Sequence, residues 1–170
     1  MKTIRLLATA AALTVATALQ AAPSGKTEVT FDHPENFTDV KDGFTPTDKG
    51  RDYILSNIRS FLVSRTEERL PEGYTLRIRF TDIDLAGDYE PQRGSRWDDV
   101  RIVKDIYPPA FKFTYSVSDA AGKVVREGTE DIRDLNFQSR VVLDDQDPLR
   151  YEKAVLGDWA RSKLAGLKRQ

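Results

Sequence analysis

The chain has 170 residues, enough for one domain with a hydrophobic core but too few for two of ordinary size. It holds 26 Lys and Arg against 27 Asp and Glu, so it lacks the basic excess typical of proteins that bind nucleic acids or anionic membranes. The absence of cysteine excludes disulfides, a cysteine nucleophile and lipidation of an N-terminal cysteine.

The first 21 residues have the features of a cleavable secretory signal peptide. Lys2 and Arg5 supply the positive charge, residues 6–19 form an apolar run, and small residues favour cleavage after Ala21. The apolar run is short for a membrane span, so a retained anchor is the weaker alternative. We therefore expect residues 22–170 to form a single domain that is exported to the periplasm and is not lipidated.

The first part of this domain predicts a strand followed by a helix. Residues 28–31 alternate as a strand does. The sequence TPTD at residues 45–48 is typical of a helix start, with Thr45 as the N-cap and proline in the first turn. One apolar face follows at helical spacing, made by Ile54, Ile58, Phe61 and Leu62. A Pro-Glu-Gly sequence at residues 71–73 then stops the helix.

Two alternating strands occupy the centre of the chain. The apolar face of the first consists of Tyr74, Leu76, Ile78 and Phe80. The apolar face of the second consists of Phe111, Phe113, Tyr115 and Val117. The register of the first strand would bring Asp82 and Asp84 to its apolar face, where unpaired carboxylates are costly. Either a bulge after Phe80 shifts the register, or the strand ends and both carboxylates find donors.

The remaining elements complete a small α+β domain. A short strand is expected around residues 100–103, before a double proline that would end any strand pairing. Residues 119–123 form a hairpin turn into a more polar strand over residues 124–132. A cap-then-proline pair at residues 147–148 opens the last helix. This order predicts an α+β fold, with an antiparallel sheet of four to five strands and two helices packed on one face.

Long motifs in this chain resemble those of a known family. They are DIDLAG (82–87), EP (90–91), DVRI (99–102), DIYPP (105–109), DLNF (134–137), DPLRYEK (147–153) and DW (158–159). In this order they resemble the proteobacterial family called domain of unknown function 3016, over nearly the whole chain after the signal peptide. The chain departs from the family at Ala160, where members often have an aromatic residue. The resemblance implies an exported protein of a Gram-negative bacterium, and it transfers no activity, cofactor or catalytic residue.

Most catalytic and metal-binding arrangements lack the residues that they require. A Ser-His-Asp mechanism would depend on His33, the single histidine, which is better interpreted as a surface turn residue beside a proline. Zinc and copper sites need several His or Cys ligands. Residues 82–88 resemble the start of a calcium loop, but Ala86 and Arg93 stand where ligands are required. We predict no metal and no cofactor, although an irregular calcium site of Asp residues in this loop stays open.

The region of residues 82–109 is the candidate binding surface. Aromatic and Arg side chains on loops are common at binding hot spots. The candidate binding residues are Asp82, Asp84, Trp97, Arg101, Asp105 and Tyr107. These residues also have a purely structural interpretation. The carboxylates would pair with arginines or with the backbone, and the aromatic side chains would fold inward and cap the sheet.

Three functions remain open. The preferred one is a non-catalytic periplasmic binding or accessory module, whose partner is an envelope protein or a cell-wall component. The second is a hydrolase of an envelope polymer, which would need Asp82 or Asp84 with a raised pKa near a second acid in a concave site. The third is a structural protein that self-associates through a sheet edge or the last helix. We expect no nucleic-acid partner and no membrane span in the mature chain, and the oligomeric state stays open.

Overall fold

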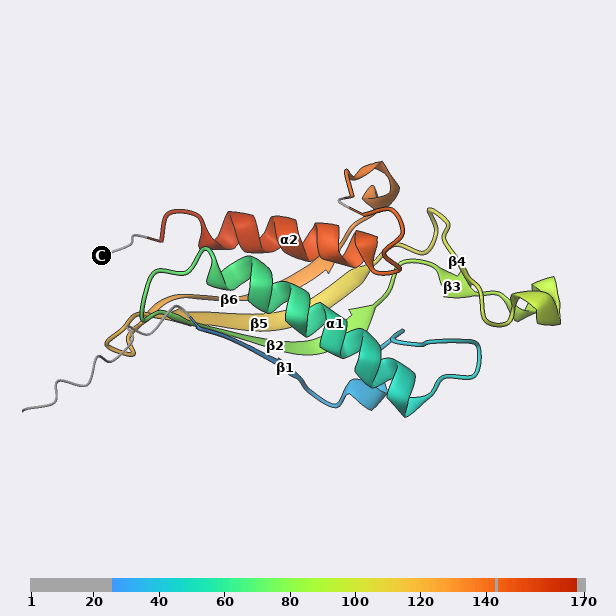
Figure 1. The fold of residues 1–170 in the computed structure, drawn as a ribbon, viewed down its shortest axis with the longest axis horizontal. Coiled ribbons are helices and arrows are strands. Elements are labelled where there is room, and N and C mark those ends of the chain that lie inside the picture. Colours follow the sequence, from blue (N-terminus) through green and yellow to red (C-terminus); the bar gives the residue numbers. More distant parts are fainter. Residues whose placement is uncertain (1–25, 143, 168–170) are drawn as a thin grey trace, which may run out of the picture.

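The computed structural model describes residues 26–142 and 144–167, and the predicted signal peptide lies outside the described residues. Four strands form the main sheet, in the spatial order β1-β2-β5-β6. Two long helices lie side by side on one face of this sheet (Figure 1). These elements are β1 (Lys26–Phe31), α1 (Asp48–Glu67), β2 (Thr75–Asp84), β5 (Ala110–Ser118), β6 (Val124–Arg133) and α2 (Arg150–Leu164).

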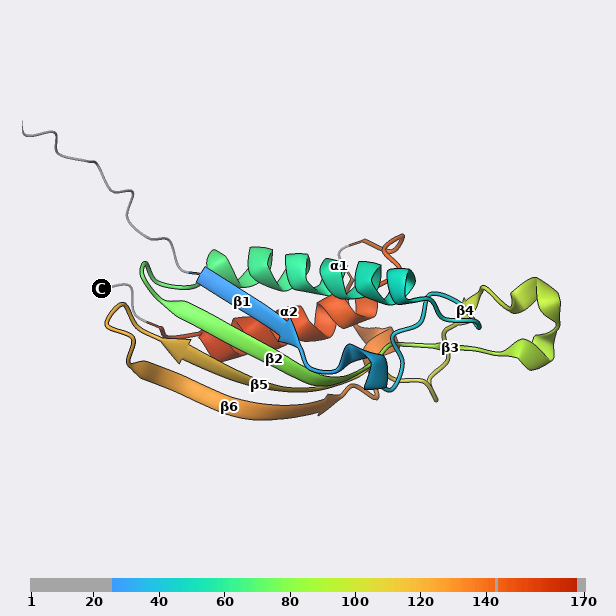
Figure 2. The same cartoon turned by 90° about the horizontal axis from the view of Figure 1, so that it is seen from below.

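The main sheet is antiparallel except at β1. Strand β1 runs parallel to β2, because α1 carries the chain back to the end of the sheet where β1 began. The β2–β5 and β5–β6 pairs are antiparallel, and Figure 2 shows the four strands side by side. The predicted α+β class, with four strands and two helices on one face, is confirmed. The parallel β1 is the correction to a purely antiparallel sheet.

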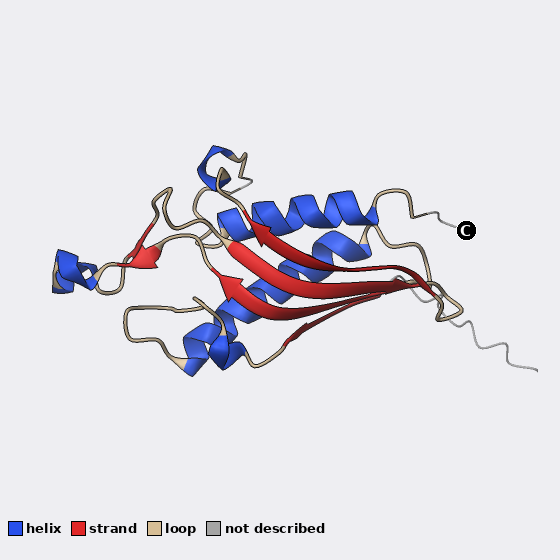
Figure 3. Cartoon of the chain, turned by 180° about the vertical axis from the view of Figure 1, so that it is seen from behind, coloured by secondary structure: helices blue, strands red, loops and turns tan. Residues whose placement is uncertain are grey.

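The other face of the main sheet carries no helix (Figure 3). Exposed polar side chains on this face include Arg77, Arg79, Lys112 and Thr114. The alternation of apolar and polar residues in β2 and β5 therefore corresponds to one packed and one solvated face, as predicted. No helix in the part of the chain that the structure describes is long and apolar enough to cross a membrane.

A β-bulge in β2 sets the register of Asp82 and Asp84. The pairing of β2 with β5 shifts between Phe80 and Asp82, so Thr81 is an extra residue. Because of this shift Ile83 is fully buried, and the two carboxylates are only half-buried. Of the two alternatives left by the sequence, the bulge is correct.

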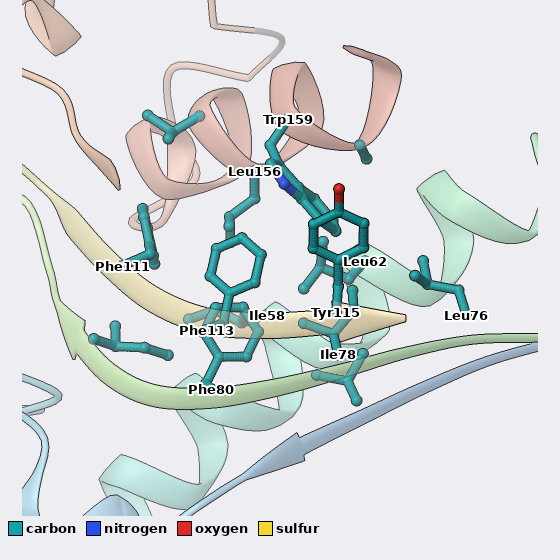
Figure 4. Close-up of a cluster of buried hydrophobic side chains, with 14 of the residues drawn as sticks. Ile58, Leu62, Leu76, Ile78, Phe80, Phe111, Phe113, Tyr115, Leu156 and Trp159 are labelled. Atoms are coloured by element: carbon teal, nitrogen blue, oxygen red, sulfur yellow. The ribbon is translucent and has the colours of Figure 1, made fainter. Parts of the chain in front are cut away.

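The core lies between the main sheet and the two helices (Figure 4). The rings of Phe80 and Phe113 lie 4.9 Å apart, and Trp159 of α2 meets Phe113 edge-on at 4.9 Å. Leu62 of α1 and Leu156 of α2 are fully buried beside these rings. Each such side chain stabilises the fold by about 1.5–3 kcal/mol, which is the main source of stability in a chain without disulfides.

The N-cap of each helix lies two residues beyond the predicted one. Thr47, rather than Thr45, caps α1, and its hydroxyl accepts a hydrogen bond from the Gly50 N–H at 2.9 Å. The Asp42 carboxylate fixes this cap, because it accepts hydrogen bonds from the N–H and the hydroxyl of Thr47. Helix α2 begins at Arg150, beyond the predicted cap-and-proline pair.

Candidate functional site

The segment between β2 and β5, residues 85–109, projects beyond the end of the main sheet (Figures 1 and 2). Its elements are β3 (Asp88–Tyr89), η2 (Pro91–Arg93), η3 (Ser95–Trp97) and β4 (Arg101–Ile102). Strands β3 and β4 pair with each other, which confirms the predicted short strand. We call residues 85–90 and 101–109 the insertion base, and residues 91–100 the insertion tip.

Arg101 joins the insertion base to Asp39, which lies in the loop before α1. Its two terminal nitrogens donate to the two carboxylate oxygens of Asp39 at 2.6 and 3.2 Å. The same guanidinium donates to the carbonyl oxygens of Gly87 at 2.8 Å and Lys41 at 3.1 Å, and it lies 4.7 Å from the ring centre of Tyr89. The Arg101 and Asp39 side chains are only 16% and 8% exposed. These internal bonds indicate a structural role for Arg101.

Asp39 reaches this position because its backbone extends the edge of β2. The Asp39 N–H donates to the Ile83 carbonyl at 3.0 Å, and the Leu85 N–H donates to the Asp39 carbonyl at 3.1 Å. This pattern is a parallel bridge between Asp39 and Asp84. Backbone pairing therefore brings a carboxylate from far along the chain to the insertion base.

Gly87 permits the close packing of β3 against β4. Its φ of 81° lies in the left-handed region, which favours glycine. A Cβ atom at this position would lie 2.8 Å from the Ile102 carbonyl oxygen and 3.1 Å from the Arg101 side chain. Any other residue here would push the two strands of the insertion base apart.

Glu90 links the two sides of the insertion base. Its buried carboxylate accepts hydrogen bonds from Lys104, from the Arg93 Nε at 2.5 Å and from the Tyr107 hydroxyl at 3.0 Å. The bonds from Lys104 and Arg93 lower the pKa of Glu90 to about 2. The hydrogen bond to Glu90 also raises the pKa of Tyr107. The Tyr107 hydroxyl is therefore part of an internal network.

A cavity of about 220 Å³ lies beside the insertion base and is lined by Asp84 and Tyr107. The other lining residues are Thr38, Asp39, Lys41, Gly87, Asp88, Ile106, Pro108 and Arg133. Burial is the main cause that raises the pKa of Asp84, and the nearby Asp39 carboxylate adds to it. Arg133, whose nitrogen lies 3.5 Å from the Asp84 carboxylate, opposes this shift. The site can thus hold Asp84 in its protonated form at a higher pH than an exposed carboxyl group.

Asp82 and Asp105 do not line this cavity. The Asp82 carboxylate accepts hydrogen bonds from the Thr38 N–H at 2.8 Å and the Thr38 hydroxyl at 2.9 Å, and lies 3.8 Å from the Lys112 nitrogen. Asp105 is exposed on a turn and makes no ion pair with any residue that the structure describes. Of the predicted residues, Asp84 and Tyr107 therefore line the cavity, and Arg101 binds Asp39 and Gly87 of its wall. Asp82 and Asp105 lie outside it.

The insertion tip exposes apolar side chains. Trp97 is 42% exposed and Val100 is 41% exposed. The loop before α1 lies against the tip, where the Phe44 N–H donates to the Asp98 carbonyl at 3.1 Å, and the Phe44 side chain is 51% exposed. Of the two alternatives for Trp97, the exposed position is the one observed.

Glu152 holds the start of the insertion base against α2. Its carboxylate is buried, and Oε1 accepts a hydrogen bond from the Ala86 N–H at 2.7 Å. The other oxygen is buried and has no hydrogen-bond partner among residues 26–142 and 144–167. Burial raises the pKa of Glu152, because the charged form has little compensation there.

Sequence reasoning missed Asp39, Glu90 and Glu152. Asp39 lies 62 residues from Arg101, and no local pattern connects the two. Glu90 belongs to a family motif, but its partners come from both sides of the insertion. Glu152 could have been found, because it shares the buried face of α2 with Val155 at the helical spacing of three residues.

No group of three or more His, Asp or Glu side chains within the described residues is placed to hold a metal ion. His33 is exposed in a turn and has a φ of 51°. Its side chain makes no capping hydrogen bond to the short helix that follows. The insertion therefore offers two features to a ligand. One is the Asp84 carboxyl group, which has a raised pKa and lies among paired charges, and the other is the apolar tip.

Comparisons with known proteins identify a family. The search of curated proteins found no match. Among solved structures, the chain is similar to a dodecamer of a PelC variant from Paraburkholderia phytofirmans, at 14% sequence identity and a TM-score of 0.37, over 88% of this chain and 92% of that one. A family model described as "Protein of unknown function (DUF3016)" matches residues 25–162. The chain therefore belongs to the DUF3016 family.

Proposed function

We propose that this protein is an exported, non-catalytic binding module that holds an envelope protein through the insertion tip. The single observation behind this proposal is the contrast within the insertion: a base fixed by the ion pairs of two buried carboxylates presents a tip with exposed Trp97 and Val100. A rigid support lowers the entropy lost on binding, and exposed aromatic residues are common binding anchors.

Phe44 enlarges this surface. The Phe44 backbone is hydrogen bonded to the tip, so its exposed ring belongs to the same end of the molecule as Trp97. Three exposed apolar side chains from two segments favour a protein partner, because their burial would supply the apolar centre of an interface.

The test is site-specific photo-cross-linking in the cell of origin. A photoreactive amino acid at position 44 or 97 should give a specific adduct that protease digestion removes. The matched control is the same amino acid at Ala121, an exposed position in the β5–β6 hairpin at the opposite end of the main sheet (Figure 1). Equal adducts from both ends, a cross-link only to a second copy of the chain, or an adduct removed only by cell-wall hydrolases would contradict the proposal.

Export is part of the same proposal and has its own test. The N-terminal pattern around Lys2 and Arg5 supports cleavage after Ala21 and a periplasmic location. Mass spectrometry of the protein from an osmotic-shock fraction should give a mature chain that starts at residue 22. A full-length chain in the cytoplasmic fraction would contradict it.

The raised pKa of Asp84 supports a second candidate, a hydrolase that acts on an envelope polymer. Asp39 is the nearby acid, but Arg101 binds both of its oxygens, and the cavity is smaller than about 300 Å³, the lower end for ligand sites. The binding proposal is therefore preferred. Release of soluble fragments from purified peptidoglycan by the wild-type protein, and not by Asp84→Asn, would reverse this preference.

A further inference from the structure

A groove of about 730 Å³ lies between α1 and α2, away from the insertion tip, and is lined by an excess of cationic side chains. The cations are Arg65, Arg69, Arg140, Arg150, Lys153 and Arg161. The acids that line the same groove are Asp144, Asp147 and Asp158. The lining thus carries three more positive than negative charges, in a chain whose formal net charge is −1.

Three of the cations are neutralised within the protein. Arg140 and Arg161 both pair with Asp158, and Lys153 pairs with Asp147. Arg140 also pairs with Asp134 outside the groove. These pairs fix one wall of the groove and neutralise Asp147 and Asp158, while Asp144 accepts a hydrogen bond from the Gln146 N–H.

The other three cations, Arg65, Arg69 and Arg150, form no ion pair with any residue in the described ranges. Two of them are held in place by aromatic rings. The Arg65 guanidinium lies 5.7 Å from the ring centre of Phe61, and that of Arg150 lies 4.6 Å from the ring centre of Tyr151. Stacking on a ring face leaves the N–H edge of the Arg65 guanidinium free to donate to an anion. Arg150 differs, because its Nη1 already donates to the Asp147 carbonyl at 3.3 Å.

The groove also has an apolar floor, formed by Phe61, Ala154 and Gly157. Gly157 is inside α2, where glycine lowers helix stability relative to alanine. Packing does not require glycine here, because an added Cβ would make an ordinary contact of 3.4 Å with the Phe61 ring. The missing side chain instead leaves the floor open beside the stacked ring.

We infer that this groove binds a small amphipathic anion, with its apolar body on the floor and its carboxylate or phosphate group bound by Arg65 and Arg69. The volume lies within the range of about 300–1,000 Å³ typical of ligand sites, and guanidinium groups suit the two oxygens of either acid. This site is separate from the tip and does not depend on the function proposed for it.

The test is titration calorimetry of the purified protein with four probes, each below its micelle-forming concentration. Octyl phosphate and octanoate carry the two possible acids, octyl glucoside has the same apolar chain without charge, and inorganic phosphate has charge without the chain. We expect binding of one or both acids, with amide NMR shifts at Ala154 and Gly157. Binding of both acids would mean that the site accepts either group. Equal affinity for octyl glucoside, or no binding of either acid, would overturn the inference.

Two variants with the same charge change localise the site. Arg65→Gln/Arg69→Gln should weaken binding of the acid by about tenfold or more, since charge-assisted hydrogen bonds are lost. Arg77→Gln/Arg79→Gln, on the uncovered face of the main sheet, should leave the affinity unchanged. Equal weakening in both variants would show non-specific attraction and overturn the inference.

Gly157→Ala separates binding from stability. Alanine should raise the midpoint temperature of thermal unfolding, because it favours the helix. It should also weaken the binding of the two octyl acids, because its methyl group would occupy the floor of the groove. Unchanged affinity in a stabilised variant would show that the floor is not part of the site.

Discussion

The base and the tip of the insertion are neighbours in sequence but differ in how their side chains are used. In the base, Glu90 is buried and Arg101 is half-buried, and each binds several partners of the same chain. In the tip, Trp97 and Val100 are exposed. A charge-rich loop can therefore contain groups that stabilise the fold beside groups that are free to bind a partner. Only their pairing and burial tell the two kinds apart.

This difference changes the interpretation of the predicted binding residues. Arg101 and Tyr107 direct their polar groups to Asp39 and Glu90, so their variants should act first on stability. Trp97 has a large exposed surface, so its variants should act on binding alone.

The largest effect is expected from Asp39→Ala. The change leaves the Arg101 guanidinium, whose side chain is only 16% exposed, without its carboxylate; the loss of one partner of a buried pair costs up to about 3–5 kcal/mol of the free energy of unfolding. Urea denaturation followed by circular dichroism measures this loss.

The matched control for this prediction is Asp32→Ala, which breaks an exposed pair with Arg79. The side chains of this pair are 33% and 61% exposed, so the expected loss is about 0–1 kcal/mol. Similar losses in the two variants would show that Arg101 is not a structural anchor.

The second prediction concerns Glu152 and has two parts. Glu152→Ala leaves the buried Ala86 N–H without an acceptor and should cost about 1–3 kcal/mol. Glu152→Gln keeps the acceptor and removes the ionisable group. Because burial raises the pKa of Glu152, the wild type loses stability as the pH rises through the interval between its unfolded and folded pKa values.

The stability advantage of Glu152→Gln over the wild type should therefore grow as the pH rises above 4.5, the ordinary pKa of a glutamate. Urea denaturation at several pH values measures the difference between the two proteins. A difference that stays constant with pH would show that the Glu152 carboxyl group has an ordinary pKa in the folded protein.

The sequence predicted the elements well because their signals are local. The alternation in β2 and β5 and the helical spacing in α1 depend on neighbours a few residues apart. The parallel β1 and the Asp39–Arg101 pair depend on segments that only the complete fold brings together. The same reason applies to the candidate site: residue types at 84, 101 and 107 pointed to the insertion, but they did not show which of their polar groups are already paired within the chain.

The third prediction concerns the pH dependence of the insertion base. The lowered pKa of Glu90 means that its pairs with Lys104 and Arg93 stabilise the base above pH 4.5 and are lost as the pH falls towards about 2. Amide heteronuclear NOE values in the insertion tip should fall over this interval. Glu90→Gln should show low values at every pH, and the control Glu28→Gln, at an exposed pair on β1, should behave as the wild type.

The smallest effect on stability is expected at the tip, from Trp97→Ser combined with Val100→Ser. Both side chains are exposed, and surface changes of this kind usually stay within about 0.5 kcal/mol for each residue.

The same variant should lose the protein adduct formed from a photoreactive group at position 44, because the partner would lose its apolar contacts. The control Val124→Ser removes an exposed apolar side chain elsewhere, at a position 47% exposed on β6, and should keep the adduct. A large loss of stability in the tip variant would mean that Trp97 supports the base, and the division between base and tip would fail. Retention of the adduct at normal stability would place the partner on another surface, while the base would keep its structural role.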